Sequence, residues 1–239
     1  MYKSLSALCF CLIFTQLCSA QMSAGFTLGT INYQGDLTEG FVNLGEINIG
    51  YGLFVTKRYD NPKFALSGHL QTGKITGNDL NYSDRWARGL RFSTPVTYLG
   101  GSFEYLPFAK KPFNEKGDFV PQKNFFVSSG MGVTFFNPTV VGLEDKAPDK
   151  IADISKAVFT IPVTVGVRFD LDPKWSIGVQ ATYSMPFTDY LDGVSLAGSP
   201  SNNDKYFFVG ISLAKKWGDI QEEIVNTKGK KKSTKKKRR

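Results

Sequence analysis

Hydrophobic and polar side chains alternate with a period of two along several segments of this chain. In Phe159–Phe169 one face carries Phe, Ile and Val, and the other carries Thr, Pro, Gly and one Arg. Trp175–Tyr183 and Phe207–Leu213 repeat the pattern. Such alternation is typical of strands that have one apolar face and one face of small or polar side chains. These three segments therefore predict β-structure in the C-terminal half of the chain.

A less regular form of the same alternation extends the prediction to eight strands. The expected strands are Ala24–Ile31, Gly45–Lys57, Phe64–Gly73, Phe92–Leu106, Asn124–Phe135, Phe159–Phe169, Trp175–Tyr183 and Phe207–Leu213. Each reaches, or nearly reaches, the ~9–11 residues that a tilted membrane strand needs. The abundance of glycine and phenylalanine, with 24 Gly and 20 Phe, also favours strands over helices.

The connections between these strands alternate in length. Short turns are expected at Arg58–Lys63 and Asp170–Lys174. Long loops are expected at about Asn32–Asn43, Lys74–Leu90, Phe136–Lys156 and Ser184–Asp204. Barrels of the outer membrane have short periplasmic turns and long outer loops. The segment Pro107–Lys123 is an exception, because it is long where a short turn is expected.

The two faces of the strands distinguish a membrane barrel from a soluble barrel or sandwich. A soluble domain would expose charged side chains, but here the non-apolar face carries mostly Gly, Ser and Thr. Aromatic side chains stand near strand ends, where interfacial girdles lie. They are Phe125, Phe135, Phe159, Phe169, Trp175, Tyr183, Phe207 and Trp217. We therefore expect an all-β fold, an eight-stranded antiparallel transmembrane β-barrel of the outer-membrane type, over residues 21–217.

The first twenty residues predict a secretory signal peptide. Lys3 precedes an apolar stretch from Leu5 to Leu17, and small residues precede Gln21. All three cysteines lie in this leader, so residues 21–239 hold no cysteine and one histidine. This composition excludes thiol catalysis, disulfide bonds and Cys/His metal sites after cleavage. We expect export to the outer membrane of a Gram-negative cell.

The net charge of +8 comes from the basic end of the C-terminal tail, which spans residues 218–239. Nine Lys or Arg stand between Lys228 and Arg239; without them, 20 basic residues face 21 acidic ones. A nucleic-acid partner is therefore not implied. In the periplasm the tail could hold an anionic surface or an acidic protein, or it could be a disordered segment with no dedicated partner. The candidate contact residues are Lys230, Lys231, Lys232, Lys235, Lys236, Lys237, Arg238 and Arg239.

His69 is the only conventional acid–base candidate after the leader. It is in phase with Ser67 and Gln71 and is expected to face the lumen. A Ser–His pair could be nucleophilic, but no carboxylate partner is evident, and a hydrogen-bonded lumen histidine is the simpler interpretation. We predict no catalytic residues, no cofactor and no metal site.

Two groups of charged residues remain. Glu46, Glu104, Arg168 and Lys216 are expected inside the barrel, as a salt-bridge network that fills the lumen or, less simply, as a proton path. The outer loops carry Glu144, Asp145, Asp149, Asp153, Asp189 and Asp192. These carboxylates could bind calcium, but no EF-hand spacing is present and solvated loop charge is the simpler interpretation.

Five short motifs resemble one known family. They are FTDYLDGVS (Phe187–Ser195), NYQGDL (Asn32–Leu37), FFNP (Phe135–Pro138) and the turns DNPKFAL and DLDPKWSIG. Together they are similar to the PorG family, the eight-stranded outer-membrane barrels of the type IX secretion system. The element Thr188, Asp189, Tyr190, Leu191 and Asp192 is the most specific part. The Lys-rich tail and the long Pro107–Lys123 segment depart from the family pattern.

The resemblance implies a non-enzymatic role in assembling a secretion apparatus. It implies partners on the periplasmic side, namely the ring formed by a lipoprotein and its partner, besides the lipid of the outer membrane. Three other functions stay open from the residues: a surface barrel whose outer loops bind ligands or adhere, a lipid-modifying enzyme centred on His69, and a narrow pore. An eight-stranded barrel is just wide enough to be filled by its own side chains, which disfavours a general porin.

Overall fold

A computed structural model describes residues 21–35, 44–82, 89–114, 118–142, 155–193 and 203–217. The expected leader, the basic tail from residue 218 and the loop acids Glu144, Asp145, Asp149 and Asp153 lie outside the described residues. Within the described residues, no helix is long and apolar enough to cross a membrane.

Eight long strands and one short strand form the described structure. They are β1 (Met22–Gln34), β2 (Asn48–Arg58), β3 (Phe64–Asn78), β4 (Arg91–Tyr105), β5 (Lys123–Phe136), β6 (Thr139–Val141), β7 (Ala157–Asp170), β8 (Trp175–Pro186) and β9 (Lys205–Trp217). Two single-turn 3-10 helices, η1 (Leu44–Glu46) and η2 (Asp79–Asn81), lie in the loops before β2 and after β3.

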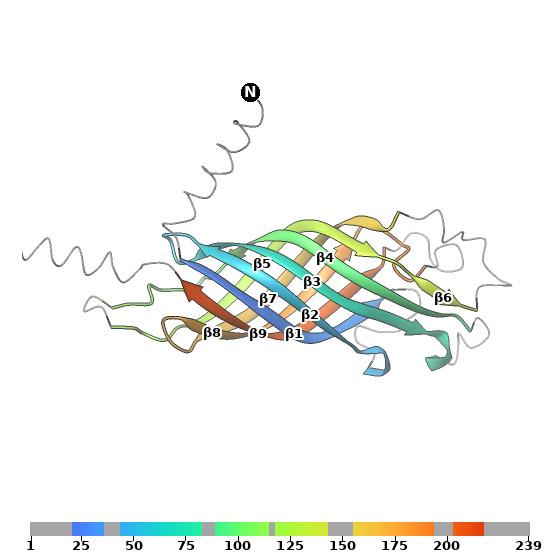
Figure 1. Ribbon diagram of the computed structural model, residues 1–239, viewed down its shortest axis with the longest axis horizontal. Helices are drawn as coiled ribbons and strands as arrows, with labels where there is room; N and C mark the ends of the chain where they lie inside the picture. Colours follow the sequence, from blue (N-terminus) through green and yellow to red (C-terminus); the bar gives the residue numbers. More distant parts are fainter. Residues whose placement is uncertain are drawn as a thin grey trace, which may run out of the picture.

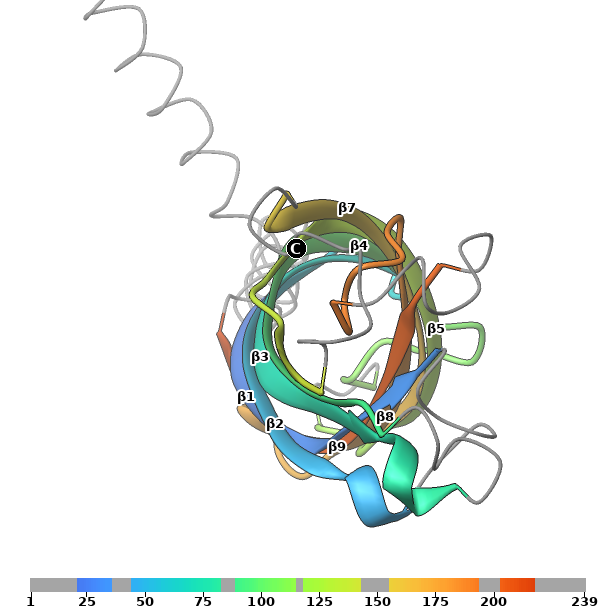
Figure 2. The same cartoon turned by 90° about the vertical axis from the view of Figure 1, so that its right-hand side faces the viewer.

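Antiparallel pairing closes the long strands into a barrel (Figures 1 and 2). Each long strand pairs with the next along the chain, and β1 pairs with β9 from Met22↔Trp217 to Gln34↔Lys205. Closure leaves no long strand with an unpaired edge, so the backbone N–H and C=O groups are satisfied inside the sheet. The fold is therefore the predicted eight-stranded antiparallel barrel.

The two ends of the barrel differ in their connections. One end of the barrel, which we call the turn end, holds the tight turns after β2 and β7 and the β4–β5 connection (Figure 1). Strand β1 begins and strand β9 ends at this end. At this end Asn61 Oδ1 accepts a hydrogen bond from the Lys63 amide, and Asp172 Oδ1 accepts from the amides of Lys174 and Trp175. Such Asx turns need Asn or Asp at these positions. The four long loops lie at the opposite end, the loop end.

Strand β6 continues β5 after a short interruption. Val96 pairs with Phe136, and three residues back along β4 Ser93 pairs with Thr139, so the register is unbroken. Pro138 stands in the gap, and proline has no amide hydrogen to donate to a neighbouring strand. The FFNP motif thus interrupts one long strand and does not shift it.

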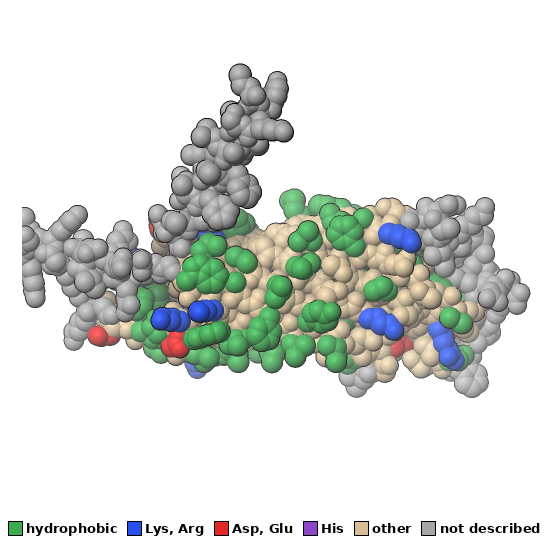
Figure 3. Space-filling model, in the orientation of Figure 1, with side chains coloured by type: hydrophobic (Ala, Val, Ile, Leu, Met, Phe, Trp, Pro, Cys, Tyr) green, Lys and Arg blue, Asp and Glu red, His purple; other side chains and the backbone are tan. Residues whose placement is uncertain are grey.

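The outer wall of the barrel is apolar and the lumen is polar at its centre. Large apolar side chains on the outer face stay exposed, for example Leu53 at 61% and Met131 at 65%. In Figure 3 green side chains spread along the visible wall, while the charged ones gather toward the two ends. An apolar surface of this extent is far larger than a soluble monomer presents. The wall is therefore built to face lipid, and residues such as Tyr105 and Trp217, both exposed at strand ends, form its girdles.

The structure confirms the eight predicted strands and their inward and outward phase, but most strands run further at their ends than predicted, β3 to Asn78 and β9 to Trp217 for example. Val163 faces outward, whereas Thr164 faces the lumen and hydrogen-bonds Thr182 at 2.9 Å. The strand expected from Gly45 begins only at Asn48, because η1 occupies the preceding residues. Conversely, β7 runs one residue further than predicted, so that Asp170 points into the lumen beside Arg168.

Candidate functional site

The lumen is closed at the loop end by a cluster of buried apolar side chains, the loop-end plug. It consists of Ile31, Tyr33, Ile75, Leu90, Phe92, Val96, Phe136, Leu191, Tyr206 and Phe208. Nine of these come from the strands or their ends, but Leu191 belongs to the loop between β8 and β9. That loop therefore contributes directly to the closure of the barrel.

The segment Thr188–Asp192 folds back into the mouth of the barrel. Leu191 is completely buried, its carbonyl accepts a hydrogen bond from Thr94 Oγ1 at 2.6 Å, and its amide donates to Asp204 Oδ2 at 2.9 Å. Gly193 follows this segment with a φ of +78°, a left-handed conformation that favours glycine. Figure 2 shows the segment after β8 bending into the ring of strands. The Thr188–Asp192 segment is thus a lid folded into the mouth of the barrel, held there by the burial of Leu191 and by its hydrogen bonds with Thr94 and Asp204.

The carboxyl groups of Asp192 and Asp204 lie beside the phenol of Tyr33 at the loop end. The Tyr33 hydroxyl hydrogen-bonds Asp192 Oδ2 at 2.8 Å and also contacts Asp204 Oδ1. A phenol has one proton, so both contacts are hydrogen bonds only when one carboxyl is protonated and donates to the phenol oxygen. Burial, followed by the charge of Asp192, raises the pKa of Asp204 well above its usual range. The cluster therefore favours a shared proton.

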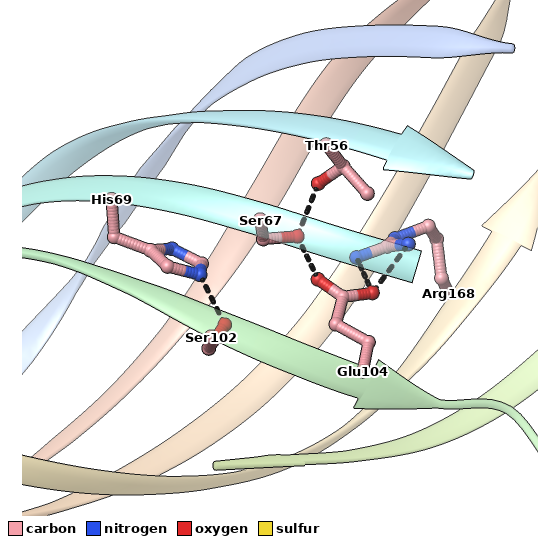
Figure 4. Close-up of polar contacts among 6 residues, drawn as sticks. All are labelled: Thr56, Ser67, His69, Ser102, Glu104 and Arg168. Atoms are coloured by element: carbon pink, nitrogen blue, oxygen red, sulfur yellow. Dashed lines mark hydrogen bonds and ion pairs between the residues drawn. The ribbon is translucent and has the colours of Figure 1, made fainter. Parts of the chain in front are cut away.

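Ion pairs close the lumen at the turn end. Glu104 Oε2 lies 3.3 Å from Arg168 Nη1, and both side chains are at least nine-tenths buried. The other carboxylate oxygen of Glu104 accepts from Ser67 Oγ, which lies 2.7 Å from Thr56 Oγ1 (Figure 4). The Arg168 guanidinium also stacks 4.9 Å from the centre of the Phe126 ring. The buried charges are thus paired and hydrogen-bonded, as burial requires.

A second ion pair completes this turn-end network. Lys216 Nζ donates to Asp170 Oδ1 at 2.8 Å, and both side chains are buried. Arg58 is also buried and interacts electrostatically with Asp170 and Glu104. Three cations and two carboxylates therefore fill the lumen here. The network fills the turn end of the lumen beside a small buried apolar cluster that includes Phe126.

The centre of the lumen is polar and nearly filled. His69 Nε2 lies 2.9 Å from Ser102 Oγ (Figure 4). Both side chains line a cavity of about 30 Å³. Gln71 and Gln180 line the same cavity. Its volume has room for about one water molecule. His69 thus hydrogen-bonds Ser102 in the lumen, whereas Ser67 donates to Glu104.

The structure brings together three of the four predicted lumen charges. Glu104, Arg168 and Lys216 belong to the turn-end network, but Glu46 does not, because it lies in η1 at the loop end. There Glu46 Oε1 accepts hydrogen bonds from the Asn78 amide and from Asn81 Nδ2, each at 3.0 Å. It fastens the loop before β2 to the loop after β3.

The interpretation of Asp189 and Asp192 as solvated loop charge was wrong. Asp192 is fully buried and Asp189 is 8% exposed, because the loop that carries them folds into the barrel mouth. The eight tail residues proposed as partner contacts lie outside the described residues. No group of three or more His, Cys, Asp or Glu that could hold a metal ion occurs in the part of the chain that the structure describes.

Four residues of the closed lumen were missed from the sequence. Asp170 and Ser102 are in phase with Arg168 and Glu104 on their strands, so the period of two could have identified both. Tyr33 and Asp204 are 171 residues apart, and no local pattern indicates that they meet.

The family model described as "Domain of unknown function (DUF6089)" matches residues 3–221. No curated protein sequence matches the chain. The match covers the whole described barrel and ends before the basic segment that starts at Lys228.

Several solved outer-membrane barrels are similar to this chain in structure. Neisserial surface protein A (NspA) aligns with a TM-score of 0.52 and 9% identity, over 82% of this chain and 97% of that chain. Ail of Yersinia pestis aligns with a TM-score of 0.44 and 10% identity, over 83% and 99%. OprG of Pseudomonas aeruginosa aligns with a TM-score of 0.42 and 13% identity, over 84% and 98%. The likeness to NspA shows the fold, and together with the apolar wall it supports an outer-membrane location.

Proposed function

Because the chain belongs to the family described as Domain of unknown function (DUF6089) and folds as an outer-membrane-type barrel, we propose that it anchors a protein secretion apparatus of the type IX kind. In this proposal the barrel is a non-enzymatic assembly component. Its wall binds the lipid of the outer membrane, and its turn end, facing the periplasm, docks the ring formed by a lipoprotein and its partner.

The observation that carries this proposal is the contrast between a closed lumen and a basic turn-end surface. Among the described residues, side chains fill both ends of the lumen, and the central cavity measures about 30 Å³. A barrel of this size can be filled by its own side chains. The surfaces at its two ends, outside the membrane, are therefore the candidates for binding a partner.

Lysines dominate the accessible charges at the turn end. Seven described lysines lie there with exposed or half-exposed side chains: Lys57, Lys63, Lys110, Lys111, Lys123, Lys174 and Lys215. Only three exposed carboxylates, Asp60, Asp118 and Asp172, lie among the described residues of the same end. The nine basic residues between Lys228 and Arg239 follow the last strand, which ends at this face. An acidic partner would be attracted to this face and bound in a salt-dependent way.

The resemblance to the PorG family supports a secretion ring as that partner. The Thr188–Asp192 motif, which carries the resemblance most specifically, closes the opposite end of the barrel and leaves the turn end for docking. The signal peptide expected at residues 1–20 fits export to this location.

The test replaces the nine basic residues of Lys228–Arg239 by Gln and keeps the length. A shuffled tail with unchanged composition is the matched control. We expect both variants to give a folded, heat-modifiable barrel, and only the neutral tail to lose the secretion-ring proteins in crosslinked pull-downs at low salt. Unchanged retention by the neutral tail at low and high salt would contradict docking through the tail. Failure of the neutral variant to insert would instead assign the tail to biogenesis.

A second function, ligand binding or adhesion by the outer loops, is favoured by the order of the loop end. Hydrogen bonds of Glu46 and Asp79 fix the loops before β2 and after β3, and Asp204 fixes the loop after β8. Such bonds would preorganise a binding surface. NspA is itself described as a surface protein. A surface role is therefore supported about as well as the secretion role. Swapping these loops and measuring cell adhesion would test it.

A further inference from the structure

A basic notch opens at the turn end between the β2–β3 turn and the β4–β5 connection. It is a shallow, open depression of about 500 Å³, and three lysines line it, Lys63, Lys110 and Lys123, together with Phe108 and Gln122. None of its lining residues is acidic. The notch therefore concentrates positive charge beside one large apolar side chain.

Backbone hydrogen bonds and buried anchors fix the shape of this notch. The Leu106 amide donates to the Lys63 carbonyl at 2.8 Å, which ties the two connections together. Leu106 and Ala109 are buried in a small apolar cluster at the turn end, and the turn between them projects Phe108 outward. Phe108 is 70% exposed. The buried neighbours Leu106 and Ala109 thus hold the Phe108 ring in an exposed position.

The notch is continuous with the lipid-facing wall. Lys63 immediately precedes Phe64, whose ring lies 5.6 Å from Phe103 and 5.5 Å from Tyr105. Leu66 pairs with Phe103 next along the wall, and both side chains are about half exposed. A lipid whose acyl chains lie on this part of the wall would place its headgroup at the three lysines.

We propose that the notch binds the headgroup of an anionic phospholipid in the leaflet at the turn end. The lysines attract the phosphate as point charges, and Phe108 enters the boundary between headgroups and acyl chains. An exposed phenylalanine gains from this boundary but not from water. A lipid fits better than an acidic peptide because the notch lies against the aromatic girdle. This inference does not depend on the secretion role.

The test uses the full mature chain in detergent with added phosphatidylglycerol or phosphatidylcholine, and counts bound lipids by native mass spectrometry. The notch variant is Lys63→Gln/Lys110→Gln/Lys123→Gln. The matched control is Lys57→Gln/Lys174→Gln/Lys215→Gln, which removes the same charge from the same end outside the notch. We expect the notch variant to bind phosphatidylglycerol about tenfold or more weakly than the control.

Phe108→Ala separates lipid binding from simple charge attraction. We expect it to weaken phosphatidylglycerol binding, with no loss in Leu171→Ala, which removes another exposed apolar side chain of the turn end. Equal phosphatidylglycerol binding by the notch and control variants would overturn the proposal. Displacement of the lipid by millimolar inorganic phosphate would overturn it as well, because the notch would then be a free-phosphate site. If only pull-down of ring proteins fell in the notch variant, the notch would be a protein surface and not a lipid site.

Discussion

The two ends of the lumen are closed by different chemistry. At the turn end, buried ion pairs such as Glu104–Arg168 join side chains that all stand on strands. At the loop end, apolar packing and the hydrogen bonds of Asp192 and Asp204 hold a loop segment in the mouth. Strand residues are fixed by the sheet, whereas the Thr188–Asp192 segment stays only while its anchors hold. The difference indicates a permanent closure at the turn end and an adjustable one at the loop end.

The largest expected effect comes from breaking the permanent closure. Glu104→Ala leaves Arg168 as a buried cation without its carboxylate and is expected to lower the free energy of unfolding by about 3–5 kcal/mol. Urea unfolding in detergent micelles, followed by tryptophan fluorescence, measures this loss. The double variant Glu104→Met/Arg168→Met removes both charges and should be much milder. A single variant as mild as the double would mean that the pair is not desolvated.

A smaller and local effect is expected at the loop end. Leu191→Ala empties part of the loop-end plug and should destabilise the folded-in segment by about 2 kcal/mol. The amides of Leu191 and Gly193 should then exchange with deuterium about thirtyfold faster. Phe187→Ala, in the same loop but 55% exposed, is the control and should change little. Unaltered exchange in Leu191→Ala would show that the lid does not depend on this side chain.

The smallest effect is a pH dependence confined to the loop end. Because the folded-state pKa of Asp204 is raised, its contribution to the lid is full below the unfolded pKa of about 4 and is lost as pH rises through the folded pKa. Protection of the Leu191 amide, corrected for intrinsic exchange, should therefore fall with rising pH. Asp204→Asn should flatten this dependence. Protection that rises with pH would contradict the shared-proton arrangement.

The barrel was predictable because its two environments impose one simple pattern. Lipid outside and a narrow lumen inside force a period of two, so the inward phase of Thr164 and the outward phase of Val163 follow from the sequence. The loop-end plug was not predictable in the same way. Leu191 lies in an irregular segment, and its burial depends on Thr94 and Asp204, far away along the chain.

The charged residues illustrate the same limit. Glu104 and Arg168 were predicted inside because both stand in phase within clear strands. Glu46 was misplaced because the alternation before β2 continues through a segment that forms the single turn η1. Local pattern thus identifies which face a strand residue takes, but strand ends and loop contacts are decided by tertiary packing.

The proposed docking function requires a protein partner at the turn end and none at the loop end. One measurement in intact cells tests both requirements. A photo-crosslinking amino acid is placed at Lys174, exposed at the turn end, and separately at Asn203, exposed at the loop end. We expect a discrete protein adduct containing a secretion-ring protein at Lys174, weakened when the basic tail is neutralised, and no such adduct at Asn203. Adducts with surface or external ligands at Asn203, and none at Lys174, would contradict docking at the turn end and favour a barrel that works through its outer loops.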